Sequence, residues 1–209
     1  MLVSNYLWNK NQDSIAKFLE HPFITGIYNG DLDRDCFKFY IAQDTFFLQA
    51  FARAYSIAAA KTKKIEEFTI FHSLADDVLK ELNLHQNYLK TWQIDPEKIQ
   101  PAPATCRYRD FLLATAWAEE IDAIAAAMTP CMRLYAFLGQ QLASRGIPNH
   151  QYREWIVTYS SPEFDRSASN LENLLDNYVR DPNLVEENYY YALFCEKDFF
   201  DAAFNSNSF

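Results

Sequence analysis

Glycine is scarce in this chain, with four residues among 209. A protein built only from β-strands needs glycine in many of its turns, so this scarcity argues against an all-β fold. The chain also holds no run of the roughly 18 consecutive apolar residues that a membrane-spanning helix needs. We therefore expect no membrane span.

The four cysteines form no pattern typical of a zinc site or a disulfide framework. Cys36, Cys106, Cys131 and Cys195 are widely spaced, and no CxxC pair occurs. Without a recognisable signal sequence, such spacing is typical of reduced thiols in an intracellular protein. The sequence therefore predicts a cytoplasmic location.

Basic residues are few relative to acidic ones. The 19 lysines and arginines face 28 aspartates and glutamates, which gives a net charge of −9 and argues against nonspecific binding to nucleic acid. Apolar residues make up 49% of the chain and aromatic residues 16%. A chain of this length and composition can bury a sizeable core, so we predict one all-α domain over residues 1–209.

Apolar residues recur at intervals of three and four, which predicts about seven helices and no strand. The expected helices cover residues 4–20, 33–61, 64–92, 107–128 with a continuation past Cys131, 149–159, 162–180 and 184–204. Phe68 and Phe71 of the third helix are expected to face the core, and Gly26 and Gly30 to lie in a short bridge. Residues 95–105 form the longest irregular connection, but composition does not change across them, so we place no domain boundary there.

The segment Ala126–Gly139, AAMTPCMRLYAFLG, combines a helical pattern with one proline. Pro130 either kinks one long helix or starts a new helix that Thr129 caps; the alanine-rich run before it favours the kink. Cys131 and Tyr135 are four residues apart and share the inward face in both geometries. Both side chains are candidates for a functional site, although a free cysteine is also a common core residue.

Two acidic residues occupy positions where the apolar stripe of a helix should continue. Asp44 falls between Ile41 and Leu48, and Glu196 falls between Leu193 and Phe200. Burying a carboxylate is costly unless it is paired or hydrogen-bonded. A structural ion pair and a functional carboxylate therefore both remain open for Asp44.

Three distant helices thus each place one reactive group on a buried face, namely Asp44, Cys131 and Glu196. Their combination with tyrosines indicates one pocket between helices. The supporting tyrosines are Tyr108, Tyr135 and Tyr159. A nucleophile, an acid or base and an orienting carboxylate are the groups that a covalent mechanism requires.

The third expected helix also carries His72, Asp76, Glu81 and His85, whose spacing invites a metal interpretation. We favour a solvated charged face with pairs of side chains along the helix surface. A di-metal oxidase is a further alternative, but its site requires about six inward-facing histidine and carboxylate ligands. We therefore expect no metal and no other cofactor.

Three segments resemble the TenA/thiaminase II family. They are HPFITGIYNGDLDRDCFKFYIAQD (21–44), TPCMRLY (129–135) and EWIVTYSSPEF (154–164), and the similarity extends from His21 to about Phe204. The resemblance implies a heme-oxygenase-like helical bundle without heme, usually a homotetramer. It also implies hydrolysis of aminopyrimidines in thiamin salvage, with slower cleavage of thiamin. A non-catalytic protein that binds a pyrimidine or thiamin-like ligand is the other alternative.

The resemblance also implies roles for individual residues. Cys131 matches the nucleophile of the family, Asp44 the carboxylate that holds the pyrimidine, and Glu196 the acid/base. Tyr108, Tyr135 and Tyr159 match tyrosines of the substrate pocket. Phe47 stands where the family often has a pocket tyrosine, and Phe200 where it often has tryptophan. Both departures keep an aromatic wall, but Phe47 lacks the hydroxyl group.

Overall fold

The computed structural model describes residues 2–95 and 98–206, apart from the side chains of residues 84, 86 and 87. Within these ranges the chain forms ten α-helices and no strand, as the apolar periodicity predicts. The helices are α1 (Val3–Lys10), α2 (Gln12–Phe18), α3 (Pro22–Asn29), α4 (Arg34–Lys61), α5 (Ile65–Thr91), α6 (Pro103–Ala118), α7 (Ile121–Ser144), α8 (Arg153–Tyr159), α9 (Pro162–Tyr178) and α10 (Pro182–Phe204).

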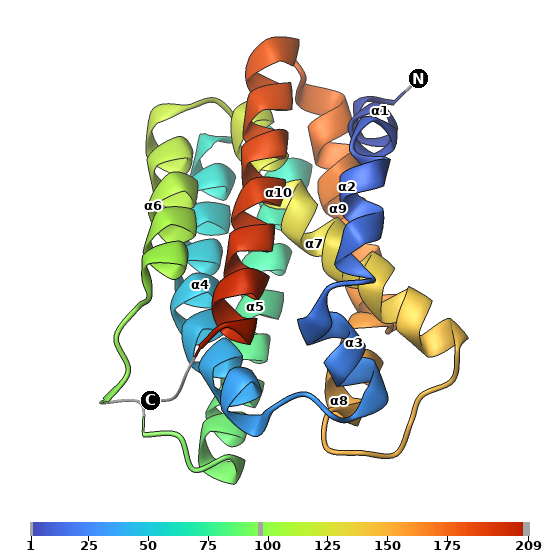
Figure 1. The fold of residues 1–209 in the computed structure, drawn as a ribbon. Coiled ribbons are helices and arrows are strands. Elements are labelled where there is room, and N and C mark those ends of the chain that lie inside the picture. Colours follow the sequence, from blue (N-terminus) through green and yellow to red (C-terminus); the bar gives the residue numbers. More distant parts are fainter. Residues whose placement is uncertain (1, 96–97, 207–209) are drawn as a thin grey trace.

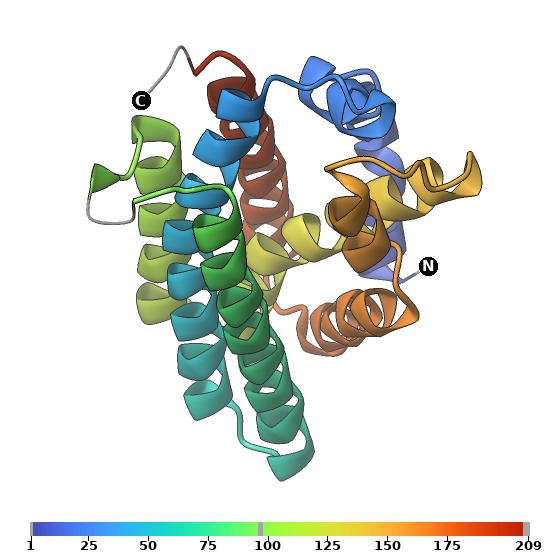
Figure 2. The same ribbon diagram turned by 90° about the horizontal axis from the view of Figure 1, so that it is seen from below.

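The helices pack around α7, which crosses the molecule obliquely (Figure 1). The long helices α4 and α5 lie side by side, and α6 and α10 stand next to α4 (Figures 1 and 2). α8 and α9 cover α7 on the side away from this group. Helices from the first, middle and last thirds of the chain therefore meet in one core, so groups distant in sequence can share a site.

The apolar character of α7 follows from its place in the core. Of the helices described, only α7 is long and apolar enough to cross a membrane by length and composition. In the structure, 89% of its most apolar window is buried inside the protein. The burial accounts for the composition, because a helix packed on several sides by other helices needs apolar residues around its circumference.

Side-chain caps begin four of the described helices, namely α3, α4, α9 and α10. Asp33 accepts a hydrogen bond from the amide of Asp35 at the start of α4, and Ser161 accepts one from Phe164 at the start of α9. Both caps confirm the predicted helix starts. The Asp181–Pro182 pair lies between the helices expected over residues 162–180 and 184–204 and begins α10, with Asp181 as the cap and Pro182 in the first turn.

The N-terminal region differs from the prediction. The single expected helix over residues 4–20 is divided at Asn11, whose side-chain amide donates to the carbonyl of Leu7. The expected bridge is helix α3, which His21 caps and which ends at Gly30 with a φ of +80°. The two glycines led us to predict a bridge rather than a helix. Gly30 instead supplies the left-handed conformation that terminates α3.

Three other expectations about the helices were wrong. The helix predicted over residues 107–128 is interrupted between α6 and α7, where the Lys61 ammonium group donates to the carbonyls of Trp117 and Glu119. The helix predicted to start at residue 149 begins only at Arg153. Phe68 is 39% exposed rather than buried, because α5 extends there beyond the helices that would cover it.

Pro130 lies inside α7 and does not start a new helix. This position confirms the continuous helix that we favoured from the alanine-rich run. Proline has no N–H to donate to the carbonyl four residues earlier, so the regular hydrogen-bond pattern is interrupted next to Cys131. The hydroxyl of Thr129 donates to the carbonyl of Ala125 at 2.7 Å in this part of the helix.

Candidate active site

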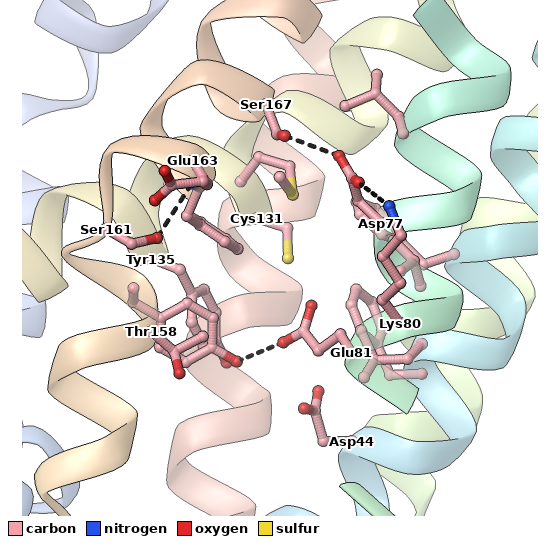
Figure 3. A pocket seen from close by; sticks show the side chains of 18 of the residues that line it. Asp44, Asp77, Lys80, Glu81, Cys131, Tyr135, Thr158, Ser161, Glu163 and Ser167 are labelled. Atoms are coloured by element: carbon pink, nitrogen blue, oxygen red, sulfur yellow. Dashed lines mark hydrogen bonds and ion pairs between the residues drawn. The ribbon is translucent and has the colours of Figure 1, made fainter. Parts of the chain in front are cut away.

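A cavity of about 420 Å³ lies between α4, α5, α7, α8 and the start of α9. Its wall extends from the buried Asp44 and Cys131 to the exposed Lys80 and Glu163 (Figure 3). Buried reactive groups are therefore connected with the surface through a cavity large enough for a small heteroaromatic molecule.

Cys131 is placed in the cavity wall by α7, where it is 8% exposed. Burial, the negative charges of Glu196 and Asp44, and a hydrogen bond to Glu196 together raise the pKa of the Cys131 thiol well above its ordinary value. Cys131 is therefore a protonated thiol in the free protein at neutral pH. It needs an adjacent base to become a nucleophile, because the thiolate is the reactive form.

Glu196 lies behind Cys131 and is the carboxyl group adjacent to this thiol. Its Oε1 atom accepts a 2.8 Å hydrogen bond from the hydroxyl of Tyr108, and its carboxylate also accepts a hydrogen bond from the Cys131 thiol. Burial raises the pKa of Glu196 to about 7, and these two hydrogen bonds oppose the rise. A carboxyl group with this pKa can both accept and donate a proton near neutral pH.

Asp44 projects from α4 and is 4% exposed. Burial, followed by the negative charges of Glu81 and Glu196, raises the pKa of Asp44 well above its ordinary value. The Oδ2 atom of Asp44 is 3.4 Å from Nε2 of His85, a longer distance than an ordinary hydrogen bond, and burial lowers the pKa of His85 to about 4. The raised pKa of Asp44 and the lowered pKa of His85 both favour the uncharged forms. We therefore interpret the contact as one between neutral side chains rather than an ion pair.

Each of these two side chains has one buried atom without a hydrogen-bond partner among the described residues. They are Oδ2 of Asp44 and Nδ1 of His85. Unpaired polar atoms are costly in a protein interior, and they are frequently the atoms that contact a bound ligand. Asp44 therefore combines a cavity-facing position with an unused hydrogen-bonding atom.

Aromatic side chains form much of the remaining wall. Phe47, Tyr135 and Tyr159 line the cavity, and the ring centroids of Tyr135 and Tyr159 are 4.7 Å apart. Tyr108 lies behind the wall with Glu196, and its ring is 4.7 Å from that of Phe47. Phe200 stacks on Tyr135 with a centroid distance of 5.6 Å and thus supports the wall from behind.

Gly139 determines how closely α8 approaches α7 near Tyr159. A Cβ atom at Gly139 would lie 2.3 Å from the carbonyl carbon of Tyr159, a distance at which the backbone would have to move. The absence of a side chain at Gly139 therefore permits the backbone contact that places Tyr159 at the cavity.

The sequence-based interpretation missed two residues of the site, Glu81 and His85. We expected both on a solvated face, but they point inward, while His72 and Asp76 are exposed and Asp76 pairs with Lys80 at 2.7 Å. The missed signal is the spacing of four, three and four residues that joins the positions to the apolar stripe. The series is Leu74, Val78, Glu81 and His85.

Glu81 also has a perturbed acidity. Its Oε1 atom accepts a 2.9 Å hydrogen bond from the hydroxyl of Tyr159, and burial raises its pKa to about 7. Atoms of Asp44, Glu81 and His85 that can bind a metal lie within 4.8 Å of one another, and this is the only such group among the described residues. One divalent ion is thus the cofactor that these side chains could hold, whereas a di-metal site needs about twice as many ligands.

The arrangement of helices defines the structural class first. A domain of unknown function with a heme oxygenase-like fold from Shewanella denitrificans superimposes with a TM-score of 0.72 at 12% identity, covering 93% of this chain and 90% of that one. The TenA homologue protein from P. horikoshii OT3 superimposes with a TM-score of 0.89 at 25% identity, covering 98% and 99% of the two chains. The protein has the predicted all-α, heme-oxygenase-like fold.

The family follows from the sequence match over this fold. The model of the TENA/THI-4/PQQC family matches residues 8–205, and the chain belongs to this family. This membership confirms the resemblance to TenA proteins that the three sequence segments indicated.

Curated relatives match over most of the chain. The aminopyrimidine aminohydrolase of Helicobacter pylori is 34% identical over 185 residues, which cover 85% of this chain and 84% of the relative. The bifunctional TH2 protein, mitochondrial, of Arabidopsis thaliana is 35% identical over 223 residues, covering 94% of this chain. The chain spans 36% of that relative and 28% of the multifunctional protein ThiED of Corynebacterium efficiens, so it corresponds to one part of these longer proteins.

Proposed function

We propose that this protein is a hydrolase of thiamin salvage. In this proposal it replaces the exocyclic amine of 4-amino-5-aminomethyl-2-methylpyrimidine (below, the amine) by a hydroxyl group, and it also cleaves thiamin. The observation that carries the proposal is the pairing of the Cys131 thiol with the Glu196 carboxyl group at a cavity that Asp44 also faces. The relatives named aminopyrimidine aminohydrolase support the choice of substrate.

Substrate binding depends on the aromatic wall and on Asp44. A flat aminopyrimidine ring stacks against Phe47 and Tyr135, which both line the cavity. Asp44 accepts a hydrogen bond from the ring amino group through the oxygen atom that is otherwise unpaired. This contact fixes the ring relative to the sulfur atom of Cys131.

The reaction begins with proton transfer from the Cys131 thiol to Glu196. The thiolate adds to a carbon of the pyrimidine ring, and Glu196 delivers the proton to a ring nitrogen, so the ring loses its aromaticity. The exocyclic amine is protonated near neutral pH, so when its carbon–nitrogen bond breaks the electron pair leaves with the nitrogen as ammonia. General acid help of this kind contributes about 10²–10⁴-fold to a rate.

Water completes the exchange. Its oxygen bonds to the exocyclic carbon and it loses one proton. The bond between the ring carbon and Cys131 then breaks, the ring nitrogen returns its proton, and aromaticity is restored. The sum is amine plus water giving alcohol plus ammonia, with Cys131 and Glu196 regenerated.

The test is ammonia release from the amine by metal-free protein, compared with cleavage of thiamin. Stoichiometric ammonia and 4-amino-5-hydroxymethyl-2-methylpyrimidine (below, the alcohol) support the proposal. Binding of the amine without product would favour the non-catalytic alternative. Activity that requires about two irons per chain would favour the di-metal oxidase instead.

We further propose that the protein is a cytoplasmic homotetramer. Support for the assembly comes from α10, where Tyr190 and Phe194 are 62% and 45% exposed, since neighbouring exposed aromatic side chains are typical of protein–protein contact surfaces. Light scattering coupled to size-exclusion chromatography tests the number of chains. A monomer at micromolar concentration would contradict the assembly but not the chemistry.

A further inference from the structure

Glu81 is a half-buried, cavity-facing acid to which the reaction described above gives no task. It projects from α5, and Figure 3 shows its carboxyl group in the cavity near Asp44. Its hydrogen bond is to Tyr159 rather than to the Cys131–Glu196 pair, so Glu81 faces the cavity independently of that pair.

Two cavities meet at Glu81. The residue lines the cavity of Cys131, and together with Thr158 and Tyr159 it also lines a neighbouring cavity of about 410 Å³. The second cavity has an aromatic lining and one further acid, Glu154. Its aromatic residues are Phe37, Tyr40, Tyr88, Trp92, Trp155 and Tyr159. A ligand whose ring lies beside Cys131 can therefore place a substituent at Glu81, where the two cavities adjoin.

The charges around Glu81 favour a cationic substituent. On α4 the neighbouring Asp44 is an acid, and on α5 burial lowers the pKa of His85 to about 4, so that this imidazole is neutral. Lys80 is the only basic residue among those described as lining the Cys131 cavity, and it is already paired with Asp76 and Asp77. No free positive charge from the described lining compensates a Glu81 carboxylate, so a cation supplied by the ligand would do so.

We propose that Glu81 binds the positively charged leaving group of the substrate at the junction of the two cavities. This inference rests on the proposed function, and it assigns to that site a residue that selects the substrate by charge. A primary amine has an ordinary pKa near that of lysine, about 10, so the aminomethyl group arrives as an ammonium ion. The carboxylate accepts hydrogen bonds from the ammonium group, and Tyr159 holds the carboxylate in position.

The charge preference distinguishes the substrate from its product. The alcohol shares the pyrimidine ring with the amine but carries no positive charge, so it loses the contact with Glu81 while it keeps those with Asp44 and the aromatic wall. Glu81 therefore favours exchange of product for substrate. The aromatic lining of the second cavity suits a larger, flat cationic leaving group through cation–π contacts.

Binding in a background that cannot turn over provides the test. Isothermal titration of Cys131→Ser protein with the amine and with the alcohol measures the charge preference directly. Adding Glu81→Gln should lower the affinity for the amine at least about tenfold, as expected for loss of a charged hydrogen bond. The affinity for the alcohol should change less than about twofold. Glutamine retains an oxygen that can accept the hydrogen bond of Tyr159, so the wall stays in place.

Glu163→Gln is the matched control, because Glu163 lines the same cavity but is exposed. This variant should leave both affinities unchanged. Equal losses for amine and alcohol in Glu81→Gln, or no loss for either, would overturn the proposal. A charge preference that disappears when EDTA is added would also overturn it, since a metal ion at Asp44, Glu81 and His85 would then be responsible.

The outcome is separable from that of the proposed function. If wild-type protein releases no ammonia but the Glu81-dependent preference for the amine persists in the titrations, the proposed hydrolase function is contradicted and the binding role of Glu81 is supported. If wild-type protein releases ammonia and Glu81→Gln binds both ligands as before, the hydrolase function is supported and the binding role of Glu81 is contradicted.

Discussion

The hydroxyl of Tyr108 donates a 2.8 Å hydrogen bond to Oε1 of Glu196, although the two residues are 88 positions apart in the chain. This bond fixes the carboxyl group that also contacts the Cys131 thiol. Tyr108 comes from α6, Cys131 from α7 and Glu196 from α10. The site therefore depends on the packing of three helices, and its groups can be tested one at a time.

Cys131→Ser should abolish ammonia release and leave the fold intact. Serine is nearly isosteric with cysteine, but its hydroxyl group is a far weaker nucleophile near neutral pH. Ammonia assays measure the rate, and circular dichroism checks the helix content. Cys106→Ser is the control, because Cys106 is only partly buried and lies outside the cavity lining. Residual activity above about a tenth of wild type would exclude Cys131 as the nucleophile.

Asp44→Asn should weaken substrate binding as well as turnover, with kcat/KM falling at least about tenfold for the loss of a hydrogen bond in a buried site. The melting temperature should change little, because Asp44 is favoured in its uncharged form and asparagine has the same shape. Michaelis kinetics and thermal melting on one preparation separate binding from stability. Asp76→Asn, an exposed position on α5, serves as control. A much lower melting temperature with normal kinetics would instead identify Asp44 as a structural partner of His85.

Glu196→Gln should lower turnover by roughly two orders of magnitude, in line with the loss of general acid and base catalysis. Wild-type protein should show a limb near pH 7 in its pH–rate profile, because the pKa of Glu196 is raised to about 7. That limb should be absent from the residual activity of the variant. Normal turnover with an unchanged profile would contradict a proton-transfer role for Glu196.

Stability should decrease as the pH rises from about 4.5 to above 7. Burial raises the pKa of Glu196 from 4.5 to about 7, so in this range Glu196 is more protonated in the folded protein than in the unfolded chain. The resulting stabilisation is complete below the unfolded pKa and is lost as the pH rises through the folded pKa. For Glu196 the difference is on the order of 3 kcal/mol.

Urea unfolding at pH 5 and pH 8 measures this dependence. Wild-type protein should have the lower free energy of unfolding at pH 8, and Glu196→Gln should show a smaller difference between the two pH values because glutamine does not titrate. Glu81 contributes a change in the same direction, since its pKa is also raised to about 7, whereas His85 contributes one in the opposite direction, since its pKa is lowered to about 4. Equal pH dependence in wild type and variant would show that Glu196 is not the group that titrates.

The sequence alone determined the class of fold and the groups at the centre of the site. Periodicity of three and four shows which face of a helix is apolar, and Asp44, Cys131 and Glu196 were conspicuous because they interrupt or share such faces. The caps at Asp33 and Ser161 were likewise predictable, because a capping side chain binds amides only two or three residues away. These features depend on neighbours along the chain.

The tertiary structure decided what depends on distant contacts. Lys61 binds the carbonyls between α6 and α7, so a helix that is continuous by local pattern is interrupted there. The spacing of Glu81 and His85 continues the apolar stripe of α5, but only the positions of Asp44 and Tyr159 show that these two side chains face a cavity. Local periodicity gives the orientation of a side chain about its own helix, whereas burial and acidity depend on which other helices pack against it.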